Sequence, residues 1–219
     1  EMAVRSCSGP WHLTPPNTME PVIRVLRYMN DTASVSYLVD EIPNQSQVTG
    51  LAVVMNSIDG RMDLARTSVH LHNLTIFNTP AINPMWRYSD SISSPTPAEP
   101  ISVLSSDMNA DGWSDLVVLC NSSAKAGTLT IYYHSGTGIS NANDNLVVTE
   151  ADLDIAAVGD LNGDGSQELA FYDATSHRIV FYNITHSRFS DLPALAGAVS
   201  LEAEDLNGDG KDELVLVNA

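Results

Sequence analysis

The chain has little positive charge. Of its 219 residues only 10 are Lys or Arg, against 27 Asp or Glu, and the formal net charge is -17 at pH 7. Proteins that bind nucleic acid neutralise phosphates with Lys and Arg side chains, so this balance argues against a nucleic-acid partner. The acidic excess is instead expected on a surface kept soluble by charge, or in loops whose carboxylates bind cations.

Long apolar runs and familiar catalytic motifs are also missing. No run approaches the roughly 20 apolar residues that a membrane-spanning helix needs, so membrane insertion is not expected. The sequence has no GxSxG, Walker, HExxH or CxxC motif. His70 and His72 lie two residues apart in a predicted strand, where a half-buried histidine pair is the simpler interpretation than a metal site. We therefore expect that the protein is not an enzyme.

Cysteine is scarce, and the two that occur are Cys7 and Cys120. They could form one disulfide that closes a loop of about 100 residues, or they could be two unrelated thiols; the sequence leaves both open. Five N-x-[ST] sequons together favour a secreted or cell-surface glycoprotein. The sequons are at Asn30, Asn44, Asn73, Asn121 and Asn183.

One acidic motif occurs three times. Each copy reads D-x-N-x-D-G-x-x-[DE]-L and is followed at once by an apolar run; the copies span 107–116, 160–169 and 205–214. Oxygen-bearing side chains at positions 1, 3, 5 and 9 of a tight loop are the ligands that a hard cation such as calcium prefers, and the glycine at position 6 permits the sharp turn. The motif therefore predicts three cation-binding loops.

A degenerate copy precedes them at 55–64. It keeps Asp59, Gly60, Asp63 and Leu64, but Met55 and Ser57 replace the first two ligands. The four copies start at 55, 107, 160 and 205, spacings of 52, 53 and 45 residues. A nearly constant period of this length is typical of a protein built from repeated supersecondary units.

The remaining pattern is all-β. Short β-branched and apolar runs enter and leave each motif, and no amphipathic helical period of useful length is present. Strands are predicted at 22–28 and 34–39, outside the repeats, and at 69–77, while 79–100 is rich in proline and is expected to be a long loop. Short strands at even spacing within a long repeat predict a β-propeller.

The three motifs resemble the calcium loops of FG-GAP and VCBS-type repeats, which occur in integrin α-subunit propellers. The resemblance covers roughly residues 50–219 and implies three structural calcium sites. It implies that positions 1, 3, 5 and 9 are ligands, together with the backbone carbonyl of position 7. These residues are Asp107, Asn109, Asp111, Trp113 and Asp115; Asp160, Asn162, Asp164, Ser166 and Glu168; and Asp205, Asn207, Asp209, Lys211 and Glu213.

Domain organisation follows from the repeats. Residues 49–219 are expected to form about four propeller blades, and the two strands within residues 1–48 could complete the last blade. The alternative is a part of a longer propeller, since integrin-like rings usually have seven blades. The expected function is a secreted or cell-surface binding or adhesion module for a protein or glycan ligand. A structural subunit of a larger extracellular assembly is the second hypothesis, and the propeller part of a secreted enzyme is a third.

Overall fold

A computed structural model describes most of the chain from residue 23 onward. The described residues are 23–31, 34–42, 48–55, 62–77, 91–121, 127–135, 138–148, 155–173, 176–183, 188–194 and 196–219. The chain divides into two compact units, Glu1–Ser46 and Gln47–Ala219. In the part of the chain that is described, no helix is long and apolar enough to cross a membrane.

The first unit contains one β-hairpin. β1 (Ile23–Asp31) pairs with β2 (Ser34–Ile42) in an antiparallel ladder that runs from Ile23↔Ile42 to Asp31↔Ser34. Both strands lie where the β-branched and aromatic runs predict them, and each extends about three residues further than predicted.

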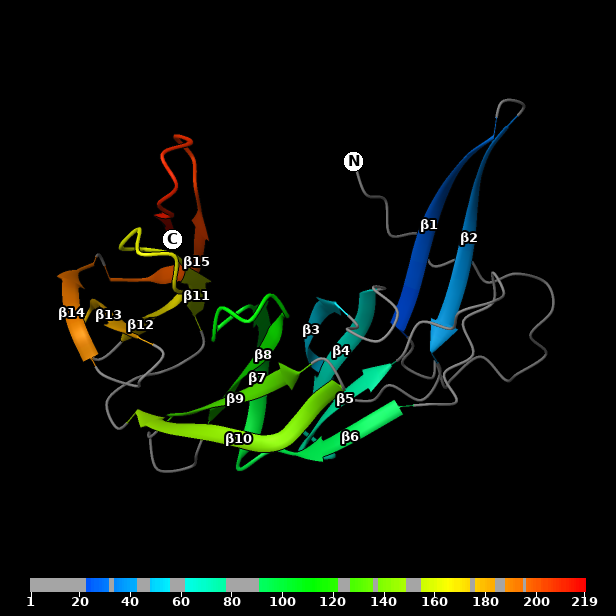
Figure 1. The fold of residues 1–219 in the computed structure, drawn as a ribbon, viewed down its shortest axis with the longest axis horizontal. Coiled ribbons are helices and arrows are strands. Elements are labelled where there is room, and N and C mark those ends of the chain that lie inside the picture. Colours follow the sequence, from blue (N-terminus) through cyan, green and yellow to red (C-terminus); the bar gives the residue numbers. More distant parts are fainter. Residues whose placement is uncertain are drawn as a thin grey trace. The chain divides into compact units, whose positions relative to one another are not determined.

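The second unit consists of consecutive antiparallel sheets, which we number I to IV (Figure 1). Sheet I contains β3 (Val48–Met55), β4 (Met62–Ser68), β5 (Asn73–Phe77) and β6 (Ser91–Pro95). Sheet II contains β7 (Glu99–Ser106), β8 (Asp115–Asn121), β9 (Gly127–Ser135) and β10 (Gly138–Val148). Sheet III contains β11 (Ala156–Gly159), β12 (Glu168–Asp173), β13 (Arg178–Tyr182) and β14 (Arg188–Pro193). Sheet IV contains β15 (Ala198–Glu204) and β16 (Glu213–Asn218).

The second strand of a sheet is covered on both faces. All six residues from Asp115 to Cys120 of β8 and all six of β12 are buried. Because successive side chains of a strand point to opposite faces, a strand buried on both sides needs apolar residues without alternation. This explains the continuous apolar runs after the first two acidic motifs; β16, after the third, is only partly buried.

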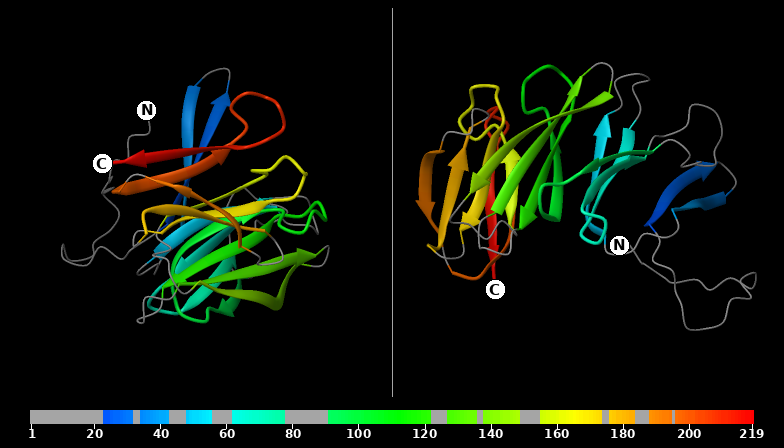
Figure 2. Two further views of the ribbon diagram at one scale, coloured as in Figure 1. Left: turned by 90° about the vertical axis from the view of Figure 1, so that its left-hand side faces the viewer. Right: turned by 90° about the horizontal axis from the view of Figure 1, so that it is seen from below.

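Successive sheets pack face to face. Val54, Ala65 and Leu74 of sheet I share a core with Val118 and Cys120 of sheet II. The next core joins Val117 and Leu119 of sheet II to Leu169 of sheet III, and a further one joins Ala170 and Phe181 of sheet III to Leu201 of sheet IV. The first strands also contact one another in order, β3 with β7, β7 with β11 and β11 with β15. In the right-hand view of Figure 2, sheets I, II and III follow one another from cyan through green to yellow and orange.

The expected all-β repeat architecture is therefore confirmed in its coarser form. Three complete four-stranded sheets and one two-stranded sheet follow the sequence repeat in order. A closed ring is not part of what the structure shows, so closure and the number of blades stay predictions.

Two local expectations were wrong. The segment 91–95 forms β6 instead of continuing a loop. Proline is tolerated there because Pro95 ends an edge strand, where a missing N–H costs no ladder hydrogen bond. The residues between Phe77 and Ser91 lie outside the described part. Second, His70 and His72 are exposed in the turn between β4 and β5, so they are not a half-buried strand pair. His72 has φ of 48°, a turn conformation that a strand does not contain.

Candidate calcium loops

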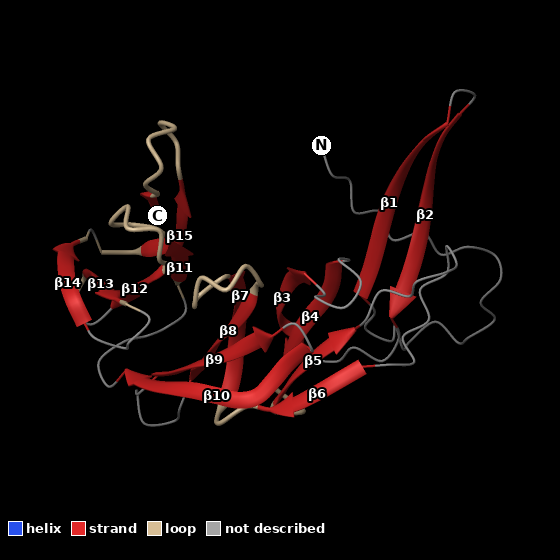
Figure 3. Ribbon diagram, viewed as in Figure 1, coloured by secondary structure: helices blue, strands red, loops and turns tan. Residues whose placement is uncertain are grey.

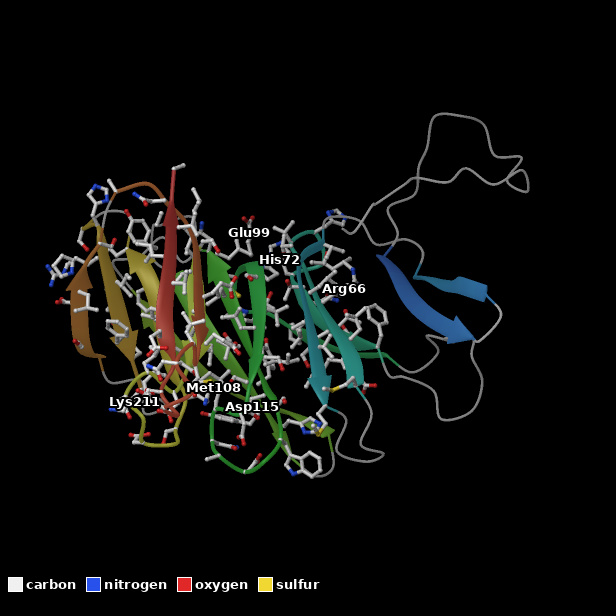
Figure 4. The ribbon with its side chains drawn as sticks, turned by 90° about the horizontal axis from the view of Figure 1, so that it is seen from above. Arg66, His72, Glu99, Met108, Asp115 and Lys211 are labelled. Carbon is white, nitrogen blue, oxygen red and sulfur yellow. The ribbon has the colours of Figure 1, made fainter. Side chains whose placement is uncertain are left out.

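Each intact motif connects the first strand of a sheet to the second. Residues 107–115 join β7 to β8, 160–168 join β11 to β12, and 205–213 join β15 to β16. These loops are drawn in tan in Figure 3. In Figure 4, Met108, Asp115 and Lys211 lie at one end of the sheets, whereas Glu99 and His72 lie at the other. The three candidate sites therefore share one end of the second unit.

The carboxylate at position 1 organises the backbone of its own loop. Asp160 accepts N–H groups from Gly163 at 2.7 Å and Asp164 at 3.1 Å on one oxygen, and from Gly165 at 2.9 Å on the other. Asp205 repeats this arrangement with Gly208, Asp209 and Gly210. In the first loop Asp107 accepts from Asp111 at 3.1 Å and from Gly112 at 2.8 Å. The same residue in each copy thus fixes the same turn.

Positions 3 and 5 continue the pattern toward the loop tip. The Asn109 side-chain oxygen accepts the Asp111 N–H at 3.0 Å, and Asp111 in turn accepts the Trp113 N–H at 2.9 Å. The other two copies make the equivalent bonds, through Asn162, Asp164 and Ser166 and through Asn207, Asp209 and Lys211. The structure therefore brings positions 1, 3 and 5 together in all three loops. The residues at positions 3 to 5, which include the position 5 carboxylate, are exposed in all three loops.

Position 9 supplies a carboxylate from the first residue of the second strand. Asp115 is fully buried and accepts N–H groups from Met108 at 2.9 Å and His134 at 2.7 Å. Glu168 is 2% exposed; it accepts the Leu161 N–H at 3.1 Å and the Asn162 side-chain amide at 3.0 Å. In the third copy Glu213 bonds Leu206 and Asn207 in the same way, but it is only half-buried.

Charge is costly at position 9. Burial raises the pKa of the Asp115 carboxyl to about 6, and repulsion by Asp111 and Asp107 adds to the increase. Burial also raises the pKa of Glu168, with repulsion by Asp164 and Asp160 contributing. The desolvated and mutually repelling carboxylates would be stabilised in their charged form by a cation.

The loops depend on left-handed backbone at two positions. At position 6, Gly112, Gly165 and Gly210 have φ of 87°, 85° and 87°. At position 4, two copies have glycine with φ of 78°, whereas the first copy has Ala110 with φ of 58°. A residue with a Cβ is strained in this region. The sequence motif predicted the left-handed residue at position 6. The left-handed conformation at position 4 was missed, because the first copy has alanine there instead of glycine.

Position 7 carries three different side chains. Trp113 is half-buried and packs on His134, with ring centroids 6.0 Å apart. Ser166 is half-buried, and Lys211 is exposed with its aliphatic part against Gly163 of the preceding loop. Only the backbone is common to the three positions, which agrees with a role through the main chain.

His134 was not identified from the sequence as part of this region. It is 4% exposed, and its Nδ1 is buried without a hydrogen-bond partner. Burial lowers its pKa, while the charges of Asp111 and Asp63 act in the opposite direction. Asp63 is position 9 of the degenerate loop and is also buried. Residues 56–61 of that loop lie outside the described part. No sequence signal connects His134 to the loops, because β9 brings it there from 19 residues beyond Asp115.

Whether calcium fits these loops depends on their donor chemistry. Positions 1, 3, 5 and 9 offer only oxygen donors, and two of the three position 9 carboxylates are buried, which suits a hard cation. In the described residues, however, no three His, Cys, Asp or Glu side chains are grouped closely enough to hold a metal ion. The carboxylate oxygens instead accept hydrogen bonds from the loop backbone. The donor atoms are of the type that calcium prefers, but they are not grouped around a single point. Calcium binding is therefore a proposal.

Neighbouring repeats are also linked beside the loops. The Ser106 hydroxyl, one residue before the first loop, donates to the Gln167 side chain at position 8 of the second loop, at 2.9 Å. A Cβ added to Gly163 of the second loop would lie 2.6 Å from Lys211 Cγ of the third loop, so the two loops approach closely there. The loops are therefore packed against one another rather than independent.

The predicted disulfide and glycosylation sites have different surroundings. Cys120 is a free cysteine buried between sheets I and II, and burial raises its thiol pKa to about 11. Cys7 lies outside the described residues, so the pairing stays a prediction. Asn73, Asn121 and Asn183 are half-buried, and the Asn73 amide donates to Ser93 at 2.8 Å. Asn30 belongs to β1 and Asn44 lies outside the described residues.

The family comparison agrees with the loop geometry. A family model described as an FG-GAP-like repeat matches residues 107–171, which contain the first two intact loops, the strands β8 to β11 between them and the start of β12. This segment is an FG-GAP-like repeat. The resemblance inferred from the motifs is thus confirmed where the match lies. A comparison with curated proteins gives no match.

Solved structures with a similar fold include two crystal structures of BBS1N in complex with ARL6DN. The one soaked with mercury has a TM-score of 0.56 and 12% identity, and the one soaked with lead has a TM-score of 0.55 and 13% identity. In both cases the similarity covers 90% of this chain and 56% of the other. This chain therefore spans little more than half the length of those chains, and at this identity the likeness concerns the fold alone.

Proposed function

We propose that this chain is a β-propeller-type module that binds a protein partner and is stabilised by calcium in its three intact loops. The observation that carries the proposal is the repetition of one loop geometry at the same end of sheets II, III and IV. Each loop places positions 3 and 5 at an exposed tip, position 1 half-buried beneath them and position 9 at the start of the second strand. The packing of successive sheets, with their first strands in contact, supports a propeller arrangement.

Calcium would have a structural role in this proposal. Asp107, Asn109, Asp111 and Asp115 would hold the ion in the first loop, with the Trp113 backbone carbonyl, and the equivalent residues would do so in the other loops. A bound calcium ion supplies positive charge that offsets the repulsion among these carboxylates. The chain itself contributes the left-handed turn, the buried position 9 acid and the hydrogen bonds that hold position 1 in place. No catalytic role is proposed.

An extracellular setting is part of the same proposal. Extracellular calcium modules bind the ion with dissociation constants of about 10⁻⁴ to 10⁻³ M, which suits millimolar calcium. The sequons and the acidic composition are compatible with a secreted or surface protein. We infer this localisation from the chemistry of the loops and sequons together.

A protein partner is favoured over a glycan by two observations. The similar structures contain BBS1N in complex with ARL6DN, another protein. A repeated sugar site would need equivalent aromatic side chains in the loops, but Trp113 corresponds to Ser166 and Lys211, and its ring packs on His134. Propellers use their loop faces for many different ligands, so the fold by itself does not select the partner.

The test is a parallel binding screen of the purified chain against arrayed ectodomain proteins and arrayed glycans, in calcium and in chelator. We expect reproducible binding to a protein, weakened in chelator and in Asp160→Ala, with Glu99→Lys at the opposite end as a control. Binding to related glycans alone would contradict the protein-partner proposal. Identical binding in calcium and chelator, with an unchanged Asp160→Ala variant, would contradict the role of calcium.

A further inference from the structure

The second and third loops are joined at one of the proposed calcium ligands. Asp212 is position 8 of the third loop and is half-buried. Its Oδ2 accepts the Asp160 N–H at 2.7 Å, and its own N–H donates to the Asp160 carbonyl at 2.9 Å. Asp160 is position 1 of the second loop. The third loop therefore holds the backbone of a residue that would bind the ion of the second loop.

The second loop depends on where Asp160 lies. The two carboxylate oxygens of Asp160 accept N–H groups from residues 163–165 of the same loop. The contact with the third loop is also close, since a Cβ added to Gly159 would lie 2.5 Å from the Asp212 carboxylate. A displacement of Asp212 would therefore displace the residue that organises the second loop.

Asp212 lies between two proposed ligand positions of its own loop. Lys211, labelled in Figure 4, is position 7, whose backbone carbonyl is a proposed ligand, and Glu213 is position 9. The Lys211 side chain also lies against the second loop, because a Cβ added to Gly163 would lie 2.6 Å from its Cγ. An ion held by residues 211 and 213 would restrict Asp212 between them.

The first and second loops are linked in a different way. Gln167 is position 8 of the second loop, as Asp212 is of the third, and its Oε1 accepts the Ser106 hydroxyl at 2.9 Å. Ser106 precedes the first loop and is not a proposed ligand. The contact joins two neutral side chains, whereas Asp212 brings a carboxylate to a backbone N–H, and a hydrogen bond to a charged group is the stronger kind. The second and third loops are therefore the more closely coupled pair.

We propose that the second and third loops bind calcium cooperatively, with Asp212 as the positioning residue that couples them, and that the first loop binds nearly independently. This inference rests on the calcium sites proposed above. When the third loop is ordered by its ion, Asp160 is already held in place, so less conformational entropy is lost when the second loop binds. Coupling between two sites is reciprocal, so each loop raises the affinity of the other by the same factor.

The test follows calcium titrations of the full 219-residue chain by NMR, which observes each loop separately. The position 6 glycine of every loop donates its N–H to the position 1 carboxylate, so its amide signal reports that loop. These glycines are Gly112, Gly165 and Gly210.

Removing one ligand at a time measures the coupling. Asp209→Ala removes the exposed position 5 carboxylate of the third loop and should lower the calcium affinity of the second loop about tenfold, a usual size for coupled sites. Asp164→Ala, the same change in the second loop, should lower the affinity of the third loop by the same factor. Asp111→Ala is the matched control in the first loop and should change the affinity of the second loop by less than about twofold.

Variants of Asp212 show whether the coupling acts through this residue. In an Asp212→Ala background, adding Asp209→Ala should no longer change the affinity of the second loop. Asp212→Asn keeps an acceptor oxygen and should retain part of the coupling. Glu204→Gln removes an exposed carboxylate of β15 and should leave the coupling unchanged. Each coupling factor is a ratio of two affinities measured in one background, so a general loss of stability does not alter it.

Two results would overturn this inference alone. The first is calcium binding at all three loops with a second loop whose affinity is the same in wild type and Asp209→Ala, which would show independent sites. The second is an effect of Asp209→Ala that keeps its full size in the Asp212→Ala background, which would show that the coupling does not act through Asp212. A chain in which none of the three glycine signals responds to calcium would contradict the proposed calcium sites themselves, and this inference with them.

Discussion

Asp212 and Asp160 hold two successive loops together. The Asp212 carboxylate, at position 8 of the third loop, accepts the Asp160 N–H at 2.7 Å, and the Asp212 N–H donates to the Asp160 carbonyl at 2.9 Å. Asp160 is position 1 of the second loop and accepts three N–H groups of its own turn. The third loop therefore positions the residue on which the second loop is built. Gly159 allows this approach, because an added Cβ would lie 2.5 Å from the Asp212 carboxylate and 2.8 Å from the Ala203 Cβ.

Removing the Asp212 carboxylate should weaken both loops. Asp212→Ala leaves the Asp160 N–H without its acceptor, and we expect a loss of about 1–3 kcal/mol in the free energy of unfolding, measured by urea denaturation. Asp212→Asn keeps an acceptor oxygen and should lose less. If the Asp212→Ala and Asp212→Asn variants were both as stable as wild type, the two loops would not be coupled through this contact. Calcium titration calorimetry on the same variants would show whether the second loop binds more weakly.

The strained Ala110 offers a stabilising substitution. Its φ of 58° at position 4 is the conformation that glycine adopts in the other two loops. The strain of a Cβ in the left-handed region costs roughly 1–2 kcal/mol, and the greater freedom of glycine in the unfolded chain offsets part of it. Ala110→Gly should therefore raise the free energy of unfolding by about 0.5–1 kcal/mol.

The reverse substitution provides the control. Gly208→Ala has open space around the added Cβ but the same positive φ, 78°, so it should destabilise by strain alone. Thermal denaturation of both variants checks the pair. An Ala110→Gly protein that melts below wild type would contradict a left-handed residue at this position.

Asp115 should make the stability of the calcium-free protein fall as pH rises. Its pKa is about 6 in the folded protein, above its ordinary value of 3.8, so the folded state binds the proton more tightly than the unfolded state. This contribution is favourable at low pH and is lost between about pH 4 and 6, with a cost at pH 7 on the order of 2–3 kcal/mol. The raised pKa of Glu168 acts in the same direction.

The measurement is urea denaturation in chelator from pH 4.5 to 7.5. The lowered pKa values of Asp164 and Asp205 act in the opposite direction, because backbone N–H groups stabilise their charged forms. For this reason the informative quantity is the difference in the free energy of unfolding between wild type and Asp115→Asn. That difference should change with pH in chelator, and a constant difference would contradict the raised pKa.

Local chemistry made the loops predictable from the sequence. The motif specifies its own hydrogen bonds, since Asp160 contacts residues only three to five positions away. The strands that follow the first two motifs were equally clear, because a strand buried on both faces is continuously apolar. These features depend on residues close in sequence, and the structure contains them all.

Features set by distant residues could not be predicted. β6 has no alternating hydrophobic pattern, because its buried residue Ser94 is polar. The contact between Asp212 and Asp160 spans 52 residues. His134 reaches Asp115 only through the β8–β9 pairing, and nothing in the sequence around Arg66 shows that its guanidinium is buried. Ala110 could not be predicted for a different reason. Alanine disfavours the left-handed conformation, but the loop imposes it at this position.

The central claim, that the three loops are structural calcium sites, is tested most directly by thermal denaturation in millimolar calcium and in chelator, for wild type and Asp160→Ala. Three sites with dissociation constants of 10⁻⁴ to 10⁻³ M together contribute roughly 1–4 kcal/mol at millimolar calcium. The account predicts that chelator lowers the melting temperature of wild type, and that Asp160→Ala lowers it in calcium but much less in chelator. A wild-type melting temperature that is the same in calcium and in chelator would contradict it.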